Sequence, residues 1–228
     1  MTERIELEGP GASRLGACWS RARVDSGAPA SALLCLHGAD ALSARPETRR
    51  ERLLELSASV LELDLGPGQR ALAGGDRELA AGVESALAWL ERRADVDARR
   101  TAVIGFGTGG TLALIVGSTS RRARAIVAVQ GAVRYSTLDA AHPIQPHELA
   151  LNLDVPLLAV FGARDAGVAD GDLEQFERSM AQAMKHVELL RFPSCGPNFH
   201  DASSAHYRAA DAEHFWSCSA EFLRRVLE

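Results

Sequence analysis

The fold of this chain is decided by the stretch from Thr101 to Leu114, which reads TAVIGFGTGGTLAL. Its first residues are small or apolar, a pattern typical of a buried strand. Its last residues are apolar again, as expected of a helix packed inside a core. The middle contains Gly105, Gly107, Gly109 and Gly110, so the chain is expected to turn sharply from strand to helix.

Short apolar runs and longer amphipathic runs alternate on both sides of this turn. Such alternation is typical of a mostly parallel sheet with helices on both faces, so we predict an α/β fold. Residues 4–24 are predicted to add one or two antiparallel edge strands. We predict further strands at Ser31–His37, Val60–Leu65, Thr101–Gly105, Ala125–Val129, Pro156–Phe161 and Val187–Phe192. We predict helices at Arg49–Ser59, Asp76–Arg93, from about Thr108, at Leu173–Met184 and at Ala209–Leu227, with a turn at Asp95–Ala98.

The length of 228 residues suits one domain, and we predict a single α/β domain over residues 1–228. No internal repeat, low-complexity segment or linker interrupts the sequence. Gly131–Leu153, which contains Pro143 and Pro146, is the longest irregular stretch. Parallel strands end at one edge of the sheet, where ligands bind, and we expect this stretch to cover that edge.

Composition and charge limit the classes of function. The net charge of −5 argues against nucleic acid, whose binding depends on Lys and Arg that neutralise phosphates. No apolar run approaches the roughly 18–20 residues of a membrane span, and the start lacks a basic region followed by an apolar one. We expect a cytoplasmic, bacterial protein without membrane contact. The four cysteines form no C-x-x-C pair, so we predict no disulfide framework, metal site or cofactor.

The glycine-rich turn matches a motif that carries chemistry. In a nucleophile elbow, small residues flank a Ser or Cys on a strained turn from strand to helix. Gly105 and Gly109 hold the flanking positions, and Gly107 stands where the nucleophile belongs. The glycines also fit the dinucleotide fingerprint G-x-G-x-x-G. That fingerprint needs an acid at the end of the next strand, but Gln130 stands there, so we regard the match as accidental.

Four segments carry a more specific resemblance. Gly105–Gly110 reads GFGTGG, Phe192–Phe199 reads FPSCGPNF, Leu34–Gly38 reads LCLHG and Pro156–Asp165 reads PLLAVFGARD. Together they resemble the dienelactone hydrolase family, which belongs to the α/β-hydrolase superfamily. That family has G-x-C-x-G-G at the first segment, where Cys is the nucleophile, and Y-P-G-A-G-H-G-F at the second, where His is the base. The resemblance covers nearly the whole chain and implies an α/β-hydrolase fold.

The resemblance also implies roles for individual residues. Asp165 matches the acid of the catalytic triad, while Gly107 replaces the nucleophile and Pro197 replaces the base. Glycine has no side chain that can form an acyl-enzyme, and proline has no titratable group. We therefore expect the scaffold of the family without covalent hydrolysis through its triad.

Backbone groups near the elbow can still act on a ligand. The N–H of Thr108 lies at a predicted helix start, which favours negative charge. Together with the N–H of Ala39 it forms an oxyanion hole, or else these amides bind only water. The family's glutamate beside the thiol falls at Gly38, so that carboxylate is missing.

Three titratable residues remain as catalytic candidates, each with a structural alternative. Asp165 is a general acid or base, or a turn carboxylate that bonds nearby amides. His200 follows Pro197 by three residues and replaces the lost base, or is a solvated loop histidine. His37 polarises a ligand, or only shapes the loop that follows its strand.

Three hypotheses of function stay open at this point. The first is an enzyme that uses these residues for non-covalent acid–base chemistry, such as cyclisation, isomerisation or elimination, on a small carbonyl or lactone-type molecule. The second is a module that binds a small molecule or a protein without turnover. The third is a rewired hydrolase that uses Cys195 or Cys35, although a free cysteine often acts as a small apolar residue.

Overall fold

The computed structural model describes residues 2–22, 28–37, 46–64, 75–165 and 167–227. Its strands form one sheet in the order β1-β2-β4-β3-β5-β6-β7-β8. The strands are β1 Thr2–Glu8, β2 Arg14–Ser20, β3 Ala30–His37, β4 Ser59–Asp64, β5 Val96–Phe106, β6 Ala125–Val129, β7 Leu157–Gly162 and β8 Val187–Phe192. The helices are α1 Pro46–Leu54, α2 Asp76–Glu91, α3 Thr108–Thr119, α4 Pro146–Leu149, α5 Asp170–Gln182 and α6 Ala209–Leu227, with short 3-10 turns at Pro10–Ala12 and Ala150–Asn152.

The register of the sheet confirms the predicted α/β fold. Strands β4, β3, β5, β6, β7 and β8 run parallel to one another. Strands β1 and β2 are antiparallel additions, and β2 joins the parallel part through β4. The parallel strands therefore end at one common edge, where the turn at Gly107 also lies.

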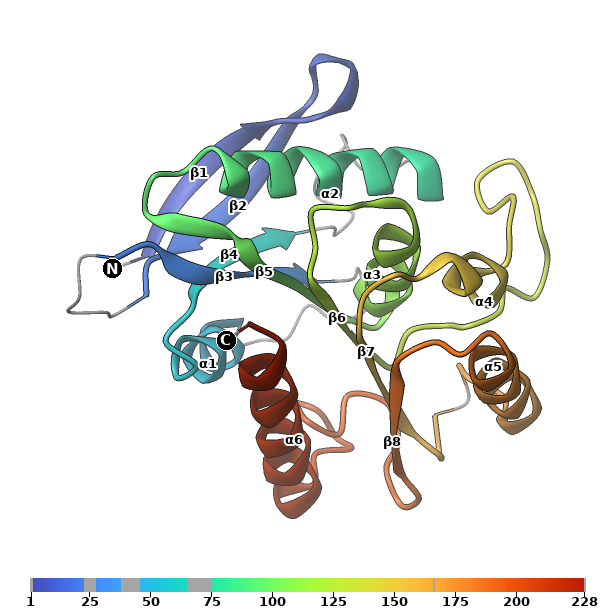
Figure 1. Ribbon diagram of the computed structural model, residues 1–228. Helices are drawn as coiled ribbons and strands as arrows, with labels where there is room; N and C mark the ends of the chain where they lie inside the picture. The colour runs from blue at the N-terminus through green and yellow to red at the C-terminus, as the bar shows by residue number, and fades with distance from the viewer. Residues whose placement is uncertain (1, 23–27, 38–45, 65–74, 166, 228) are drawn as a thin grey trace.

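Helices cover both faces of the sheet (Figure 1), and each face has its own apolar core. On one face, α2, α3 and α5 pack against side chains such as Leu34 and Val103. On the other face, α1 and α6 pack against side chains such as Leu33 and Ile104. Neighbouring residues of one strand serve opposite cores, so the central strands appear in the sequence as continuous apolar runs.

Two predicted boundaries are wrong for reasons of tertiary pairing. The turn predicted at Asp95–Ala98 is mostly strand, because β5 already begins at Val96 and pairs with β3 there. The N–H of Ala30 donates to the carbonyl oxygen of Asp95 at 3.0 Å, just ahead of this pairing. The helix predicted over Arg49–Ser59 ends at residue 54, and the chain turns at Ser57 with φ 56°.

The unit formed by β5, the turn and α3 depends on the absence of two side chains. A β-carbon on Gly105 would lie 2.0 Å from the carbonyl oxygen of Gly109. A β-carbon on Gly109 would lie 2.4 Å from the carbonyl oxygen of Leu36 in β3. The first turn of α3 therefore rests directly on the backbone of two central strands.

We predict that Gly105→Ala lowers the free energy of unfolding by roughly 2–4 kcal/mol, because the new methyl group meets backbone atoms that cannot move independently of α3. Urea denaturation measures this change. Gly171→Ala in α5 is the matched control, since a β-carbon there meets nothing within 4 Å, and it should be neutral or slightly stabilising. Equal stability of the two variants would contradict the close packing of strand and helix.

Candidate active site

Gly107 lies between the end of β5 and the start of α3 with φ 56° and ψ −124°. Side chains disfavour this backbone region, whereas glycine adopts it readily. The N–H of Gly107 donates to the carbonyl oxygen of Val129 at 2.9 Å, and its own carbonyl accepts from the N–H of Gly110 at 2.8 Å. The sharp bend expected from the sequence is thus present and fixed by backbone hydrogen bonds.

Asp165 follows β7 at the same edge of the sheet and is half-buried. Its Oδ1 accepts the backbone N–H of Gly167 at 2.9 Å, which is the behaviour of a turn carboxylate. Its Oδ2 accepts from Gln130 Nε2 at 3.2 Å. The carboxylate is therefore held in place from both sides.

Gln130 is a residue of the site that the sequence analysis did not select. It follows β6 directly, has φ 53° and is buried. Besides Asp165, its Nε2 donates to the carbonyl oxygen of Gly196 at 2.9 Å, and its Oε1 accepts the N–H of Asn198 at 2.8 Å. These two bonds are made to the residues directly before and after Pro197. Gln130 thus links the loop of the candidate acid to the loop where the family carries its base. A polar residue at the end of a central strand was the signal that was available.

His37 ends β3 in a buried polar network. Its Nε2 lies 3.2 Å from Glu62 Oε1 and 3.6 Å from Cys35 Sγ, and its Nδ1 lies 2.8 Å from Arg49 Nη1. Burial lowers the pKa of His37, yet Cys35 and Glu62 outweigh burial and raise it to about 9. A proton on both ring nitrogens would nevertheless place an N–H of His37 against an N–H of Arg49. The hydrogen bond from Arg49 therefore favours the neutral ring, with its proton on Nε2.

His200 is only 6% exposed, so its interpretation as a solvated loop histidine is wrong. Its ring packs among aromatic side chains. The centroid of the ring lies 5.0 Å from that of Phe106 and 5.3 Å from that of Phe215. Neither ring nitrogen has a hydrogen-bond partner in the part of the chain that the structure describes. Burial, together with the charge of Arg49, lowers the pKa of His200 to about 3. The ring therefore stays neutral at physiological pH.

The two histidines share one cluster, and Asp165 does not join it. Phe106 lies between their rings, with centroids 6.5 Å from His37 and 5.0 Å from His200. The guanidinium of Arg49 lies 4.0 Å above the ring of Phe106. Within the described residues, the hydrogen bonds of the Asp165 carboxylate come from Gln130 and Gly167. Neither histidine is thus hydrogen-bonded to the candidate acid.

The other predicted site residues have varied positions. Thr108 is exposed at the start of α3, as expected, and Pro197 is half-buried. Gly38 and Ala39 lie outside the described residues. Cys35 and Cys195 are both fully buried. Burial, assisted by Asp211, raises the pKa of Cys195 to about 11, so this thiol resists forming the thiolate that a nucleophile needs.

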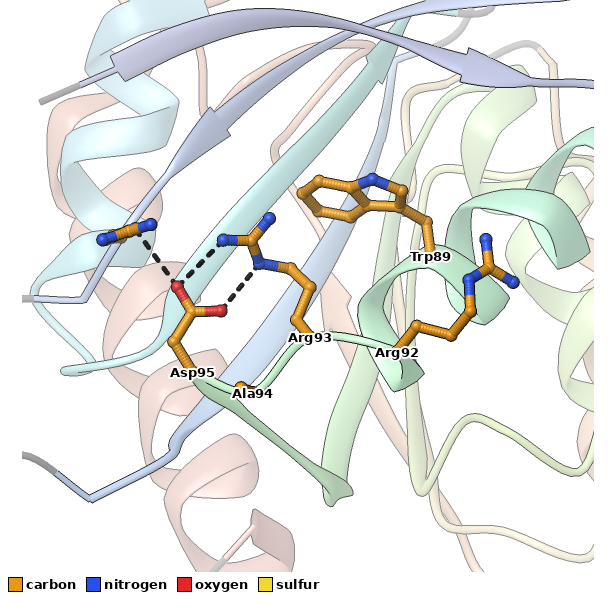
Figure 2. Close-up of a pocket in the computed structure, with 6 residues that line it drawn as sticks. Trp89, Arg92, Arg93, Ala94 and Asp95 are labelled. Carbon is orange, nitrogen blue, oxygen red and sulfur yellow. Dashed lines mark hydrogen bonds and ion pairs between the residues drawn. The ribbon is translucent and has the colours of Figure 1, made fainter.

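A surface hollow of about 470 Å³ lies at the opposite edge of the sheet, where β5 begins (Figure 2). Asp95 holds Arg93 there through bonds of 2.7 and 3.0 Å and Arg21 through one of 3.1 Å. The guanidinium of Arg93 also lies against the rings of Trp19 and Trp89. Of the three arginines that line the hollow, Arg21 and Arg93 share this carboxylate partner, and the hollow is separate from the elbow.

Two general properties of the described residues bear on function. No helix among them is long and apolar enough to cross a membrane. In the same ranges, no group of three or more His, Cys, Asp or Glu side chains is arranged to hold a metal ion.

The model of the dienelactone hydrolase family matches residues 69–227 of this sequence. The chain belongs to the dienelactone hydrolase family. The predicted resemblance is thereby confirmed, and the eight-stranded, mostly parallel sheet confirms the α/β-hydrolase fold class.

Solved structures agree with the family's fold. A candidate dienelactone hydrolase from Klebsiella pneumoniae subsp. pneumoniae MGH 78578 has a TM-score of 0.87 at 18% identity, over 98% of each chain. A dienelactone hydrolase-like promiscuous phosphotriesterase from metagenomic libraries has a TM-score of 0.82 at 19% identity, over 100% of this chain and 99% of that chain. At these identities the likeness shows the fold alone.

One curated relative is a Bradyrhizobium sp protein named "Probable 2-oxo-3-(5-oxofuran-2-ylidene)propanoate lactonase". It is 30% identical over 149 residues, which make up 65% of this chain and 60% of the relative. The chain thus spans only part of the length of that relative.

We predict that Gln130→Leu destabilises this family member by about 2–3 kcal/mol, because buried partners on two loops lose their hydrogen bonds. Urea denaturation measures the stability, and hydrogen exchange at the amide of Asn198 reports the loop directly. Gln182→Leu is the control, since that side chain is exposed in α5. Unchanged protection of the Asn198 amide would show that Gln130 does not fix the loop.

We also predict that His200 makes stability depend on pH. Its pKa is about 3 in the folded protein, against about 6.5 for an unfolded histidine, so between these values only the unfolded chain binds this proton. Stability is therefore lost as the pH falls below about 6.5, by up to about 1.4 kcal/mol per pH unit.

In His200→Phe this contribution is absent, because the new ring cannot bind a proton. Unfolding free energies of both proteins at pH 7 and pH 5 measure the effect, and the natural protein should lose about 2 kcal/mol more than the variant. Equal losses would mean that His200 is not buried as a neutral ring.

Proposed function

We propose that this protein binds a small carbonyl or lactone-type molecule at the edge where the parallel strands end, and acts on it by acid–base chemistry without a covalent intermediate. The observation that carries the proposal is that the elbow has no side chain at the nucleophile position, while a carboxylate is held in place at the same edge. Gly107 offers no nucleophile, while Asp165 is held by Gln130 and Gly167 at the same edge.

The chemistry uses groups that this chain retains. Asp165 exchanges a proton with the bound molecule, and the start of α3 favours the negative charge that develops on its carbonyl oxygen. Isomerisation, cyclisation and elimination all need these two elements and no acyl-enzyme. The space beside Gly107, which a nucleophile fills in other family members, is left to the ligand.

The printed name of the Bradyrhizobium relative supports the choice of ligand class. Its compound is an unsaturated lactone that carries a 2-oxo carboxylate. Such a molecule has carbonyl oxygens conjugated with carbon–carbon double bonds, on which negative charge can develop, and it is therefore a suitable first probe.

A second candidate function is binding without turnover, and one observation favours it. His37 and His200 lie in their own buried cluster around Phe106, and neither is hydrogen-bonded to Asp165 in the described residues. Without a histidine bonded to Asp165, this edge of the sheet can hold a metabolite without converting it.

We predict that incubation with the oxofuranylidene lactone gives a product without any covalent adduct on the protein. Asp165→Asn should reduce turnover by about 100-fold or more and leave affinity within about threefold, because Asn can still accept the bond from Gln130 but cannot exchange a proton. Nuclear magnetic resonance follows the product, and intact-mass spectrometry detects an adduct.

An acyl adduct, or turnover that persists in Asp165→Asn, would reject the proposed chemistry. Thermal stabilisation by the lactone without product would support the binding function instead. The double variant Gly107→Cys with Pro197→His is the positive control for the adduct, since it restores a nucleophile and a base to the bend. It should form an acyl-enzyme with 4-nitrophenyl acetate, which the natural protein should not.

A further inference from the structure

Three side chains outside the triad positions meet at the start of α2, and we call them the Asp76 cluster. Asp76 is the first residue of α2 and is 8% exposed. Tyr135 and His142 come from the segment that joins β6 to α4. Tyr135 Oη donates to Asp76 Oδ1 at 2.9 Å, and His142 Nδ1 lies 3.0 Å from the same oxygen. The two rings lie against each other with centroids 4.5 Å apart.

The hydrogen bonds determine where the proton of the neutral imidazole lies. A carboxylate only accepts hydrogen bonds, so His142 Nδ1 must donate to Asp76. The lone pair of the neutral ring is then on Nε2, on a side chain that remains 39% exposed. An Asp that fixes the tautomer of a His, with Nε2 left to take a proton, is the arrangement of hydrolytic triads.

Asp76 places a buried carboxylate beside His142. Its second oxygen, Oδ2, is buried and has no hydrogen-bond partner among the described residues. Burial, together with Asp76, raises the pKa of Tyr135, so the phenol keeps its proton and brings no charge. A buried carboxylate with an unpartnered oxygen stabilises an imidazolium beside it, and proton transfer to His142 requires such stabilisation.

Among the described residues, Asp139 of the same segment also bonds His142, through its backbone. Its Oδ1 accepts the backbone N–H of His142 at 2.7 Å and that of Ala141 at 2.8 Å. The Asp139 carboxylate thus fixes the backbone of His142. The carbonyl oxygen of Ala141 in turn accepts the N–H of Asp76 at 2.8 Å, which attaches the segment to α2.

The topology places the Asp76 cluster at the same edge as the elbow. Helices α2 and α3 pack on one face of the sheet, and both begin where the parallel strands end (Figure 1). Helices α2 and α3 also contact each other directly. At Gly131 the segment lies on the first turn of α3, where a β-carbon would be 2.4 Å from the nitrogen of Thr111.

We propose that His142, oriented by Asp76, is a catalytic base of this edge and performs the proton removal for which Pro197 has no group. The inference rests on the proposed function for its substrate, a small carbonyl or lactone-type molecule. His142 touches the substrate through Nε2, and Asp76 is a positioning residue that acts through His142.

The proposed step balances without any oxidant or reductant. Nε2 of His142 takes a proton from the carbon beside the carbonyl group, and the electron pair of the broken C–H bond moves to the carbonyl oxygen as an enolate. The imidazolium of His142 then delivers this same proton to a second carbon or to a leaving oxygen, which returns His142 to its starting state.

The first experiment tests the base with nitrobenzisoxazole, whose ring opens when a base removes its carbon-bound proton. His142→Gln and Asp76→Asn should each lower the rate of ring opening by about tenfold or more relative to the natural protein. The pH–rate profile of the natural protein should contain a step that His142→Gln lacks. His147→Gln is the matched control, since its Nδ1 bonds only a backbone carbonyl oxygen of the same segment, and it should keep the full rate.

The second experiment measures the same nitrogen without any turnover. Diethyl pyrocarbonate acylates unprotonated imidazole nitrogens, and peptide mapping reports each histidine separately. His142 should react faster than His186, although His186 is exposed, and Asp76→Asn should slow only His142. Equal rates at both residues, or unaltered ring opening in His142→Gln, would overturn the proposal.

A lactone with a saturated carbon beside its carbonyl group, 5-methyl-2(3H)-furanone, separates the two proposals. If the natural protein and His142→Gln convert it equally well, the role of His142 is rejected and the proposed function stands. If the natural protein leaves the lactone unchanged while ring opening of nitrobenzisoxazole depends on His142, the proposed function fails and the base remains supported. Circular dichroism of each variant checks that it is folded.

Discussion

The carbonyl oxygen of Gly109 lies 2.0 Å from the point where a β-carbon of Gly105 would stand, and this contact between β5 and α3 organises the active edge. It is available only to glycine, because any side chain would push the helix away from the sheet. The contact fixes the bend at Gly107, whose N–H bonds the carbonyl of Val129 at the end of β6. The helix start, the bend and the end of the neighbouring strand are consequently held as one rigid unit.

Gln130 extends this rigidity to the loops that follow β7 and β8. Its amide group bonds the Asp165 carboxylate, the carbonyl of Gly196 and the N–H of Asn198 at the same time. In the family pattern an acid and a base meet between these loops. Here Gln130, which cannot exchange a proton, connects the loops directly. The scaffold of the family is thus compatible with quite different chemistry, since function belongs to the site and not to the fold.

Burial separates the histidines of this edge into two kinds. His200 is enclosed by aromatic rings and stays neutral, and His37 is held between Glu62 and Arg49. Both contribute to packing around Phe106. His142 differs, because its ring is partly exposed while its Asp76 partner is buried. Solvent and a ligand can therefore reach this ring.

The sequence by itself determined the architecture. Apolar runs and glycines identified β6, β8 and α6 with their observed ends, and family motifs assigned Gly107, Asp165 and Pro197 to one edge. These features are local, since a few consecutive residues determine periodicity and backbone freedom.

Only the tertiary structure decided the partners of each polar group. The early start of β5 depends on pairing with β3. The burial of His200 depends on the rings of Phe106 and Phe215. The role of Gln130 depends on bonds to residues that lie 66 and 68 positions further along the chain. Exposure and hydrogen bonding are set by segments far apart in the chain, and no local pattern records which of them will meet.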